Sequence, residues 1–175
     1  MKKLKNNLFV FFLLALFLLP GCRKLGEFKI KDSSEFTIPG TTPLGIFVPT
    51  PMEVASSSSY EFKNNGTETK HVKEVRLDQM TLTIIDPSTQ TFKFLNSVHI
   101  YISADGLPEV EIAYLDNIPP TVGSSIELLT TGAVLDAYIK KEKYKLQVKT
   151  VTDDVLADDV KIRSDLTFRV KAKIL

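Results

Sequence analysis

The densest group of chemically capable side chains is a run of four aspartates, Asp153, Asp154, Asp158 and Asp159. They form two carboxylate pairs around three apolar residues, and carboxylate oxygens are the ligands that Ca²⁺ prefers. The run lacks the Asp-x-Asp-x-Asp-Gly order with a distal glutamate that a calcium loop uses, and aspartates are also common turn residues. We therefore treat the four aspartates as a weak candidate metal site, with a solvated turn as the stronger interpretation. No cofactor other than this Ca²⁺ alternative is predicted.

Nucleophiles and proton-transfer groups are scarce in this chain. Cys22 is its single cysteine, and the two histidines, His71 and His99, have no second histidine two or four residues away, as a zinc site would need. Residues 123–125 read Gly-Ser-Ser and do not form the Gly-x-Ser-x-Gly turn of serine hydrolases. The sequence therefore offers no catalytic residue, and we expect a protein that is not an enzyme.

Cys22 follows a leader with the layout of an export signal. Lys2, Lys3 and Lys5 form a positive start, and residues 8–19 are twelve uninterrupted apolar residues. As a helix that run would span only about 18 Å, which is short against the roughly 30 Å hydrocarbon core of a bilayer. The run ends in Leu-Pro-Gly-Cys at residues 19–22.

This ending resembles the lipobox of bacterial lipoproteins, in which small residues precede a cysteine that is acylated on sulfur. The resemblance implies a signal peptidase II-type leader over residues 1–21 and a lipidated Cys22 as the mature N-terminus. Pro20 departs from the Ala, Ser or Thr that the family more often has at that position. An ordinary secretory leader and an uncleaved anchor are the alternatives, and in each case the bulk of the chain lies outside the cytoplasm.

The mature chain of 154 residues is the size of one domain with a linker. Three of the 22 basic residues and none of the 21 acidic residues lie in the leader, which leaves a formal charge of −2 and no basic footprint for nucleic acid. Lipidation of the only cysteine would exclude a disulfide framework. Residues 22–34 are polar, with Gly26 and Ser33–Ser34, and are expected to be a flexible tether before a domain over 35–175.

Alternation of apolar and polar residues dominates the rest of the chain. It predicts strands over residues 57–63, 71–85, 98–103, 110–114, 125–129, 144–148 and 166–174. A hairpin turn is expected at 64–66, a second at Asp105–Gly106, a bulge near Asp78 and Gln79, and a short helical turn within 133–141. The fold class is therefore all-β, a single antiparallel β-sandwich of roughly seven to nine strands, immunoglobulin-like or related, with a closed barrel as the alternative.

The segment 39–59 carries four prolines and reads as a long loop or edge segment. Its apolar residues are expected to cap an open end of the core or to form an exposed patch for a partner. They are Leu44, Ile46, Phe47, Val48 and Met52. A strand with Asp86 and Pro87 behind it is also faintly similar to the water-stress and late-embryogenesis β-sandwich domains, over fewer than ten residues.

These observations predict a membrane-tethered, non-enzymatic cell-envelope lipoprotein that acts through contacts with an envelope protein. Lipidated Cys22 would hold it on the membrane, most simply the outer membrane of a Gram-negative bacterium, facing the periplasm, because the residues after Cys22 lack the acidic run that resembles a surface-export signal. The alternative is a lipoprotein that binds a glycan or a divalent cation on a sheet face or loop end. The chain has no tryptophan, so Tyr101 is the obvious stacking residue for a glycan.

Overall fold

The computed structural model of the protein describes residues 25–174. The predicted leader 1–21 and the lipidated Cys22 lie outside these residues. The strands are β1 Leu25–Ile38, β2 Gly45–Phe47, β3 Met52–Ala55, β4 Val72–Asp86, β5 Leu95–Ala104, β6 Leu107–Leu115, β7 Ser125–Thr130, β8 Lys143–Thr152 and β9 Val160–Lys173. The helices are α2 Ser58–Asn64 and α3 Asp136–Ile139, with single 3-10 turns η2 Thr69–His71 and η3 Phe92–Phe94. Neither α2 nor α3 is long and apolar enough to cross a membrane.

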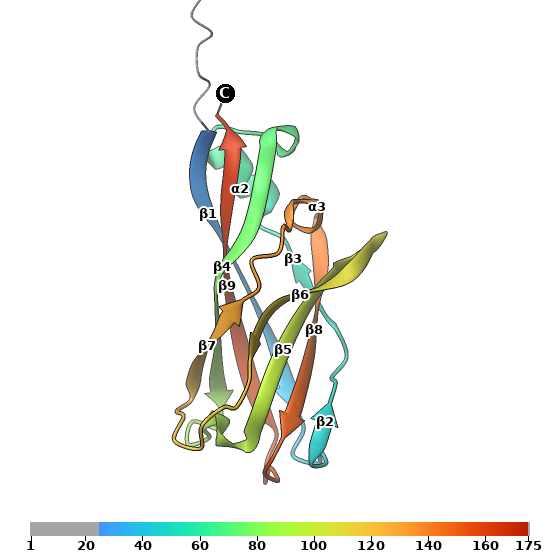
Figure 1. Ribbon diagram of the computed structural model, residues 1–175, viewed down its shortest axis with the longest axis vertical. Helices are drawn as coiled ribbons and strands as arrows, with labels where there is room; N and C mark the ends of the chain where they lie inside the picture. Colours follow the sequence, from blue (N-terminus) through green and yellow to red (C-terminus); the bar gives the residue numbers. More distant parts are fainter. Residues whose placement is uncertain (1–24, 175) are drawn as a thin grey trace, which may run out of the picture.

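The strands form two antiparallel layers that are joined along one edge (Figure 1). The first layer has the order β1-β9-β4-β7, and the second has the order β6-β5-β8-β2, with β3 also paired to β8. The layers are joined where Ala113 and Tyr114 of β6 pair with Thr130 and Leu129 of β7. The order ends in β1 on one side and β2 on the other, and no backbone pairing between these two is found in residues 25–174, so the sheet is not closed into a barrel.

Strands β2 and β3 are two pieces of one interrupted strand, because both pair with β8. Pro49 and Pro51 lie between them and have no backbone N–H for the ladder. The Gln147 side-chain amide instead donates to the Pro49 carbonyl at 2.6 Å and bridges the gap. With β2 and β3 counted as one, the strand order is that of a jelly roll, two Greek keys folded into a sandwich.

The prediction of a single antiparallel β-sandwich with seven to nine strands is therefore confirmed, with the jelly-roll order rather than the immunoglobulin one. The predicted strands after residue 70 all form. Strands β4 and β7 agree with their expected bounds within one residue, whereas β5, β6, β8 and β9 each extend three to six residues beyond one expected bound. The expected bulge is present as a register shift between Leu77 and Gln79, and the expected helical turn is α3. Gly106 turns the β5–β6 hairpin with a φ of 78°, which glycine adopts at little cost.

The predicted tether is wrong over residues 25–34, which form most of β1. Each residue from Leu25 to Ile38 pairs with β9, from Lys173 to Val160. The sequence pattern does not predict a strand here, because two of the side chains that point into the sandwich are polar. Asp32 is buried and receives hydrogen bonds, and Ser34 meets the Ser164 hydroxyl at 2.7 Å. The folded domain therefore includes residue 25, only three residues after Cys22.

The predicted strand over 57–63 is also wrong, because these residues form α2. Ser58 and Phe62, four residues apart, are buried on one helical face, whereas Tyr60 is 68 % exposed. Phe62 packs edge-on against Phe28 of β1, with ring centroids 6.2 Å apart. Gly66, at a φ of 65°, adopts the left-handed conformation that commonly ends a helix, so it does not turn the predicted hairpin. The Thr67 N–H then donates to the Phe62 carbonyl.

The molecule is elongated, with different elements at its two ends (Figure 1). The start of β1, the end of β9, the start of β4 and α2 share one end, since Leu25 pairs with Lys173 and Val72 pairs with Ala172. Strand β2 and the loop 153–159 between β8 and β9 lie at the other end. Fourteen residues of β1 at about 3.3 Å each separate these ends by roughly 40 Å.

Asp32 connects three parts of the fold. Its carboxylate accepts hydrogen bonds from the Tyr144 hydroxyl of β8 at 2.9 Å and from the Ser57 hydroxyl and backbone N–H, at 2.6 and 3.1 Å. Ser57 is the residue from which α2 starts. Burial raises the pKa of the Tyr144 phenol, with the Asp32 charge adding to it, so the tyrosine stays a neutral donor. One carboxylate thus ties the first layer to the second and to α2.

The Tyr144→Phe substitution should destabilise the protein by about 1.5 to 3 kcal/mol, because it removes one donor from a buried carboxylate while keeping the ring. The matched control is Tyr60→Phe, which removes the same hydroxyl from an exposed ring and should change stability by less than about 0.5 kcal/mol. Urea denaturation followed by circular dichroism measures both. Equal effects of the two substitutions would contradict the role assigned to Asp32.

Candidate interaction surfaces

The sequence-predicted apolar segment forms an exposed surface at the β2 end, which we call the apolar edge: Leu44, Ile46, Phe47, Val48 and Met52. Ile46, the central residue of β2, is 79 % exposed, and Leu44 and Val48 are also exposed. Phe47 and Met52 are half-buried and pack against the core. Two side chains of the segment therefore pack against the core and three face outward, and a partner for the exposed three stays a prediction.

A shallow hollow of about 450 Å³ adjoins the apolar edge. It is lined by Phe36, Thr37, Pro39, Phe47, Val48, Pro49, Thr50 and Met52. Residues 36–52 contain no charged residue, in a chain in which 25 % of residues are charged. Strand β2 is an outermost strand, held on one side by β8 through backbone pairs and through the Thr150 and Thr152 hydroxyls. The apolar edge is thus an uncharged, partly grooved surface along a sheet edge.

A second surface lies on the outer face of β5, β6 and β8 and is centred on His99. The imidazole Nδ1 lies 2.6 Å from Glu111 Oε1, and Nε2 lies 3.1 Å from Asp116 Oδ1. The ring stacks on Tyr114, with centroids 6.0 Å apart. The hydrogen bond with Glu111 raises the pKa of His99 above its ordinary value; burial opposes this increase, and Asp116 adds to it.

The polar groups around His99 already pair with one another. Both imidazole nitrogens are occupied by carboxylates, so neither is left to ligate a metal or to take a proton from a substrate. The Lys149 ammonium lies 3.8 Å above the Tyr101 ring and pairs with Glu109 at 2.8 Å. Tyr101, the predicted stacking residue for a glycan, is therefore already covered on one face. The glycan alternative stays a prediction that no feature of this surface favours.

The alternation predicted over residues 98–103 puts His99 and Tyr101 on the polar face of their strand, but it does not identify Glu111, Tyr114 and Asp116 as neighbours of His99. A hairpin without bulges around Asp105–Gly106 would pair His99 with Ile112. The structure pairs it with Tyr114, because the register shifts between Ile100 and Tyr101 and again between Ile102 and Ala104. Bulges of this kind leave no clear mark in the sequence, so the partners of His99 could not be read from alternation.

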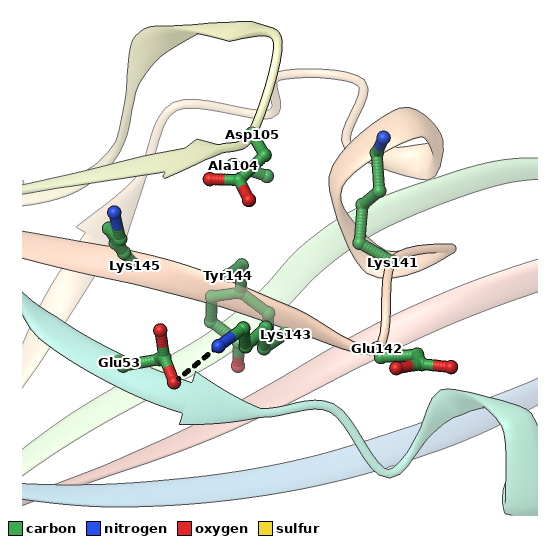
Figure 2. A pocket seen from close by; sticks show the side chains of 8 residues that line it. All are labelled: Glu53, Ala104, Asp105, Lys141, Glu142, Lys143, Tyr144 and Lys145. Carbon is green, nitrogen blue, oxygen red and sulfur yellow. Dashed lines mark hydrogen bonds and ion pairs between the residues drawn. The ribbon is translucent and has the colours of Figure 1, made fainter.

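A third feature is a hollow of about 310 Å³ between β3, the β5–β6 turn and the start of β8 (Figure 2). It is lined by Glu53, Ala104, Asp105, Lys141, Glu142, Lys143, Tyr144 and Lys145. Lys143 pairs with Glu53 at 2.9 Å across its rim, and this hydrogen bond raises the pKa of Lys143. Ligand sites are mostly apolar with a few fixed polar groups, whereas six of these eight side chains are charged. The hollow therefore lacks the features of a preformed ligand site.

The four aspartates of the candidate metal site do not act together. Asp153 accepts from the Asn96 side chain at 2.8 Å, Asp154 from the Val155 N–H at 2.9 Å, and Asp159 from the Gly40 N–H at 2.9 Å. In residues 25–174 there is no group of three His, Cys, Asp or Glu side chains arranged to hold a metal ion. Asp153 and Asp159 instead tie the loop 153–159 to Asn96 and Gly40, so the calcium alternative gains no support.

Comparison with known proteins gives only distant similarities. No family model matches the chain, and no curated protein does. Among solved structures, the decameric BFDV capsid protein has 12 % identity and a TM-score of 0.43, over 85 % of this chain and 99 % of that one. A protein from Eubacterium rectale has 11 % identity and a TM-score of 0.42, over 86 % of this chain and 41 % of that one. An infectious bursal disease virus structure has 12 % identity and a TM-score of 0.36, over 87 % of this chain and 38 % of that one. Similarities this low carry no information on function.

The His99 cluster should make stability depend on pH with a defined sign. Because the pKa of His99 is raised in the folded protein, its contribution is complete below the ordinary histidine pKa of about 6.5 and is lost as the pH rises through the raised value. The difference in urea midpoint between the protein and His99→Gln should be larger at about pH 5.5 than at about pH 8. A difference that is constant between these pH values would contradict the ion pairs.

Proposed function

We propose that this protein is a lipid-anchored, non-enzymatic module of the bacterial cell envelope that binds an envelope protein through its apolar edge. The leader 1–21 and its lipobox support the anchor, with the inward face of the outer membrane as the favoured location. The observation that carries the proposed binding role is the position of Ile46, 79 % exposed at the centre of an outermost strand.

The chemistry of the apolar edge supports an extended protein segment as the partner. An outermost strand can receive an added strand, which makes backbone hydrogen bonds and places alternate side chains in neighbouring hollows. The hollow beside Phe47 and Pro49 would accept such a side chain. Pro43, Pro49 and Pro51 flank β2 and limit indiscriminate pairing, as proline does on sheet edges generally. Since residues 36–52 carry no charge, the matching segment is itself apolar and uncharged.

The anchor is tested by Cys22→Ser in the native host. The unsubstituted protein should begin at an acylated Cys22, give an intact mass that includes the acyl chains, and fractionate with membranes, because two or more chains hold a protein stably on a bilayer. The Cys22→Ser protein should lose the acyl mass and leave the membrane fraction. An unmodified Cys22 thiol in the purified native protein would contradict the anchor.

The binding role is tested by a photo-crosslinking amino acid at position 46, with position 134 as the control. Val134 is 50 % exposed in the loop between β7 and α3, outside the apolar edge. We expect a discrete adduct with one envelope protein from position 46 and none from position 134. Ile46→Asp should weaken that complex by about 2 kcal/mol, roughly 30-fold, whereas Val134→Asp should leave it unchanged.

Ile46 is a better test residue than Phe47, although both lie in the same predicted segment. Phe47 packs against the core, so an aspartate there would also destabilise the fold. Ile46→Asp changes an exposed side chain and should leave the urea midpoint nearly unchanged. The same adduct pattern from positions 46 and 134, or equal complex with Ile46→Asp and the unsubstituted protein, would count against the apolar edge as the binding surface.

A further inference from the structure

The position of β1 limits how an anchored domain can sit on a membrane. Leu25, the first residue of β1, is three residues after Cys22, and three extended residues reach at most about 11 Å. If Cys22 is lipidated, as proposed above, the end of the domain that holds Leu25 lies against the lipid headgroups. This end comprises the start of β1, the end of β9, α2 and the start of β4, and we call it the anchored end (Figure 1).

The anchored end carries side chains suited to an anionic lipid surface. Lys63, Lys73 and Lys173 lie on it, and within residues 25–174 none of the three has an ion-pair partner. Tyr60 on α2 is 68 % exposed, and Ile174 is exposed at the end of β9. Lysine beside exposed tyrosine and aliphatic side chains is the combination found where proteins meet headgroups.

Other charges at the anchored end largely cancel. Lys70 pairs with Glu68 at 2.7 Å, and Lys171 pairs with Glu74 at 3.1 Å. Glu27 and Glu61 are the remaining acidic residues there, and they are outnumbered by the three lysines together with Arg23 and Lys24 of the preceding sequence. The anchored end is therefore positive, although the mature chain as a whole is slightly negative.

The opposite end has the reverse character. The loop 153–159 carries four aspartates and no basic residue, and the uncharged apolar edge lies beside it on β2. An anionic bilayer would attract the anchored end and repel the aspartate loop, so the domain's charge distribution selects one orientation.

We infer that the anchored end rests on anionic lipid headgroups and that the domain stands upright on the membrane. Upright, it presents the apolar edge roughly 40 Å away from the bilayer, at the height of a partner rather than of the lipid. The four aspartates then lie at the end of the domain that the anionic bilayer repels. The anchored end therefore binds the lipid surface rather than a protein.

The orientation is tested by energy transfer from a single label to a headgroup dye, with the lipidated full-length protein in vesicles of phosphatidylethanolamine and phosphatidylglycerol. Acylation blocks Cys22, so an introduced cysteine is the only thiol that reacts. Asn64→Cys places the label at the anchored end, and Ala157→Cys places it in the aspartate loop, both at exposed positions. We expect transfer from position 64 to be several times that from position 157. Equal transfer from both positions would overturn the inference.

Charge variants separate the lipid contact from the tether. Combined Lys63→Glu, Lys73→Glu and Lys173→Glu should reduce the difference between the two labels, because the tether still holds Leu25 near the bilayer but the positive charge that keeps the domain upright is lost. The matched control combines Lys93→Glu, Lys145→Glu and Lys161→Glu, which makes the same change of charge away from the anchored end and should preserve the difference. Circular dichroism checks that both variants fold. A difference of the same size in the first set and in the unsubstituted protein would show that lipid charge does not orient the domain.

Flotation with the vesicles distinguishes a failure of the lipid anchor from a failure of the upright orientation. A protein that floats but shows equal transfer from both labels overturns the upright orientation and leaves the anchor standing. A protein that does not float, and whose Cys22 thiol reacts with maleimide, overturns the anchor and the orientation with it. Vesicles of phosphatidylcholine alone should reduce the difference between labels without affecting flotation, because acyl chains insert into neutral and anionic bilayers alike.

Discussion

The buried Asp32 carboxylate is the contact on which the arrangement of the domain depends. It joins β1 of the first layer to Tyr144 of the second and to Ser57 at the start of α2. A buried carboxylate is tolerated only when donors surround it, and donors from three separate segments converge on this one. Within residues 25–174 the two layers share strand pairing only between β6 and β7, so this contact helps to hold together the opposite side of the sandwich.

The same strand that carries Asp32 gives the molecule its polarity. Strand β1 starts near Cys22 and ends close to β2, so the two ends of one fourteen-residue strand separate the sequence's predicted anchor from the apolar edge. Lysines lie at one end and aspartates at the other. Leu25 and Ile46 are only 21 residues apart in the sequence, but the start of β1 and strand β2 lie at opposite ends of the elongated domain.

Much of the fold could be predicted because alternation is a local property. Over much of their length, strands β4 to β9 alternate apolar and polar side chains, and the bulge at Asp78 was visible as a change of parity. β1 and α2 were missed for opposite reasons. Strand β1 places polar Asp32 and Ser34 inward, which breaks the apolar pattern, whereas α2 has Tyr60 and Phe62 at strand-like spacing although only Phe62 is buried.

The sequence by itself determined the single cysteine, the all-β class and the apolar segment 44–52, and it predicts the leader, since each follows from residue type and short-range spacing. Tertiary structure alone decided which distant polar residues meet: Asp32 with Tyr144, His99 with Glu111 and Asp116, Asp153 with Asn96, and Asp159 with the Gly40 N–H. Such pairings depend on strand order and on bulges that shift the register. Partners that come from distant segments are chosen by packing and hydrogen bonding across the whole sandwich, which no local pattern encodes.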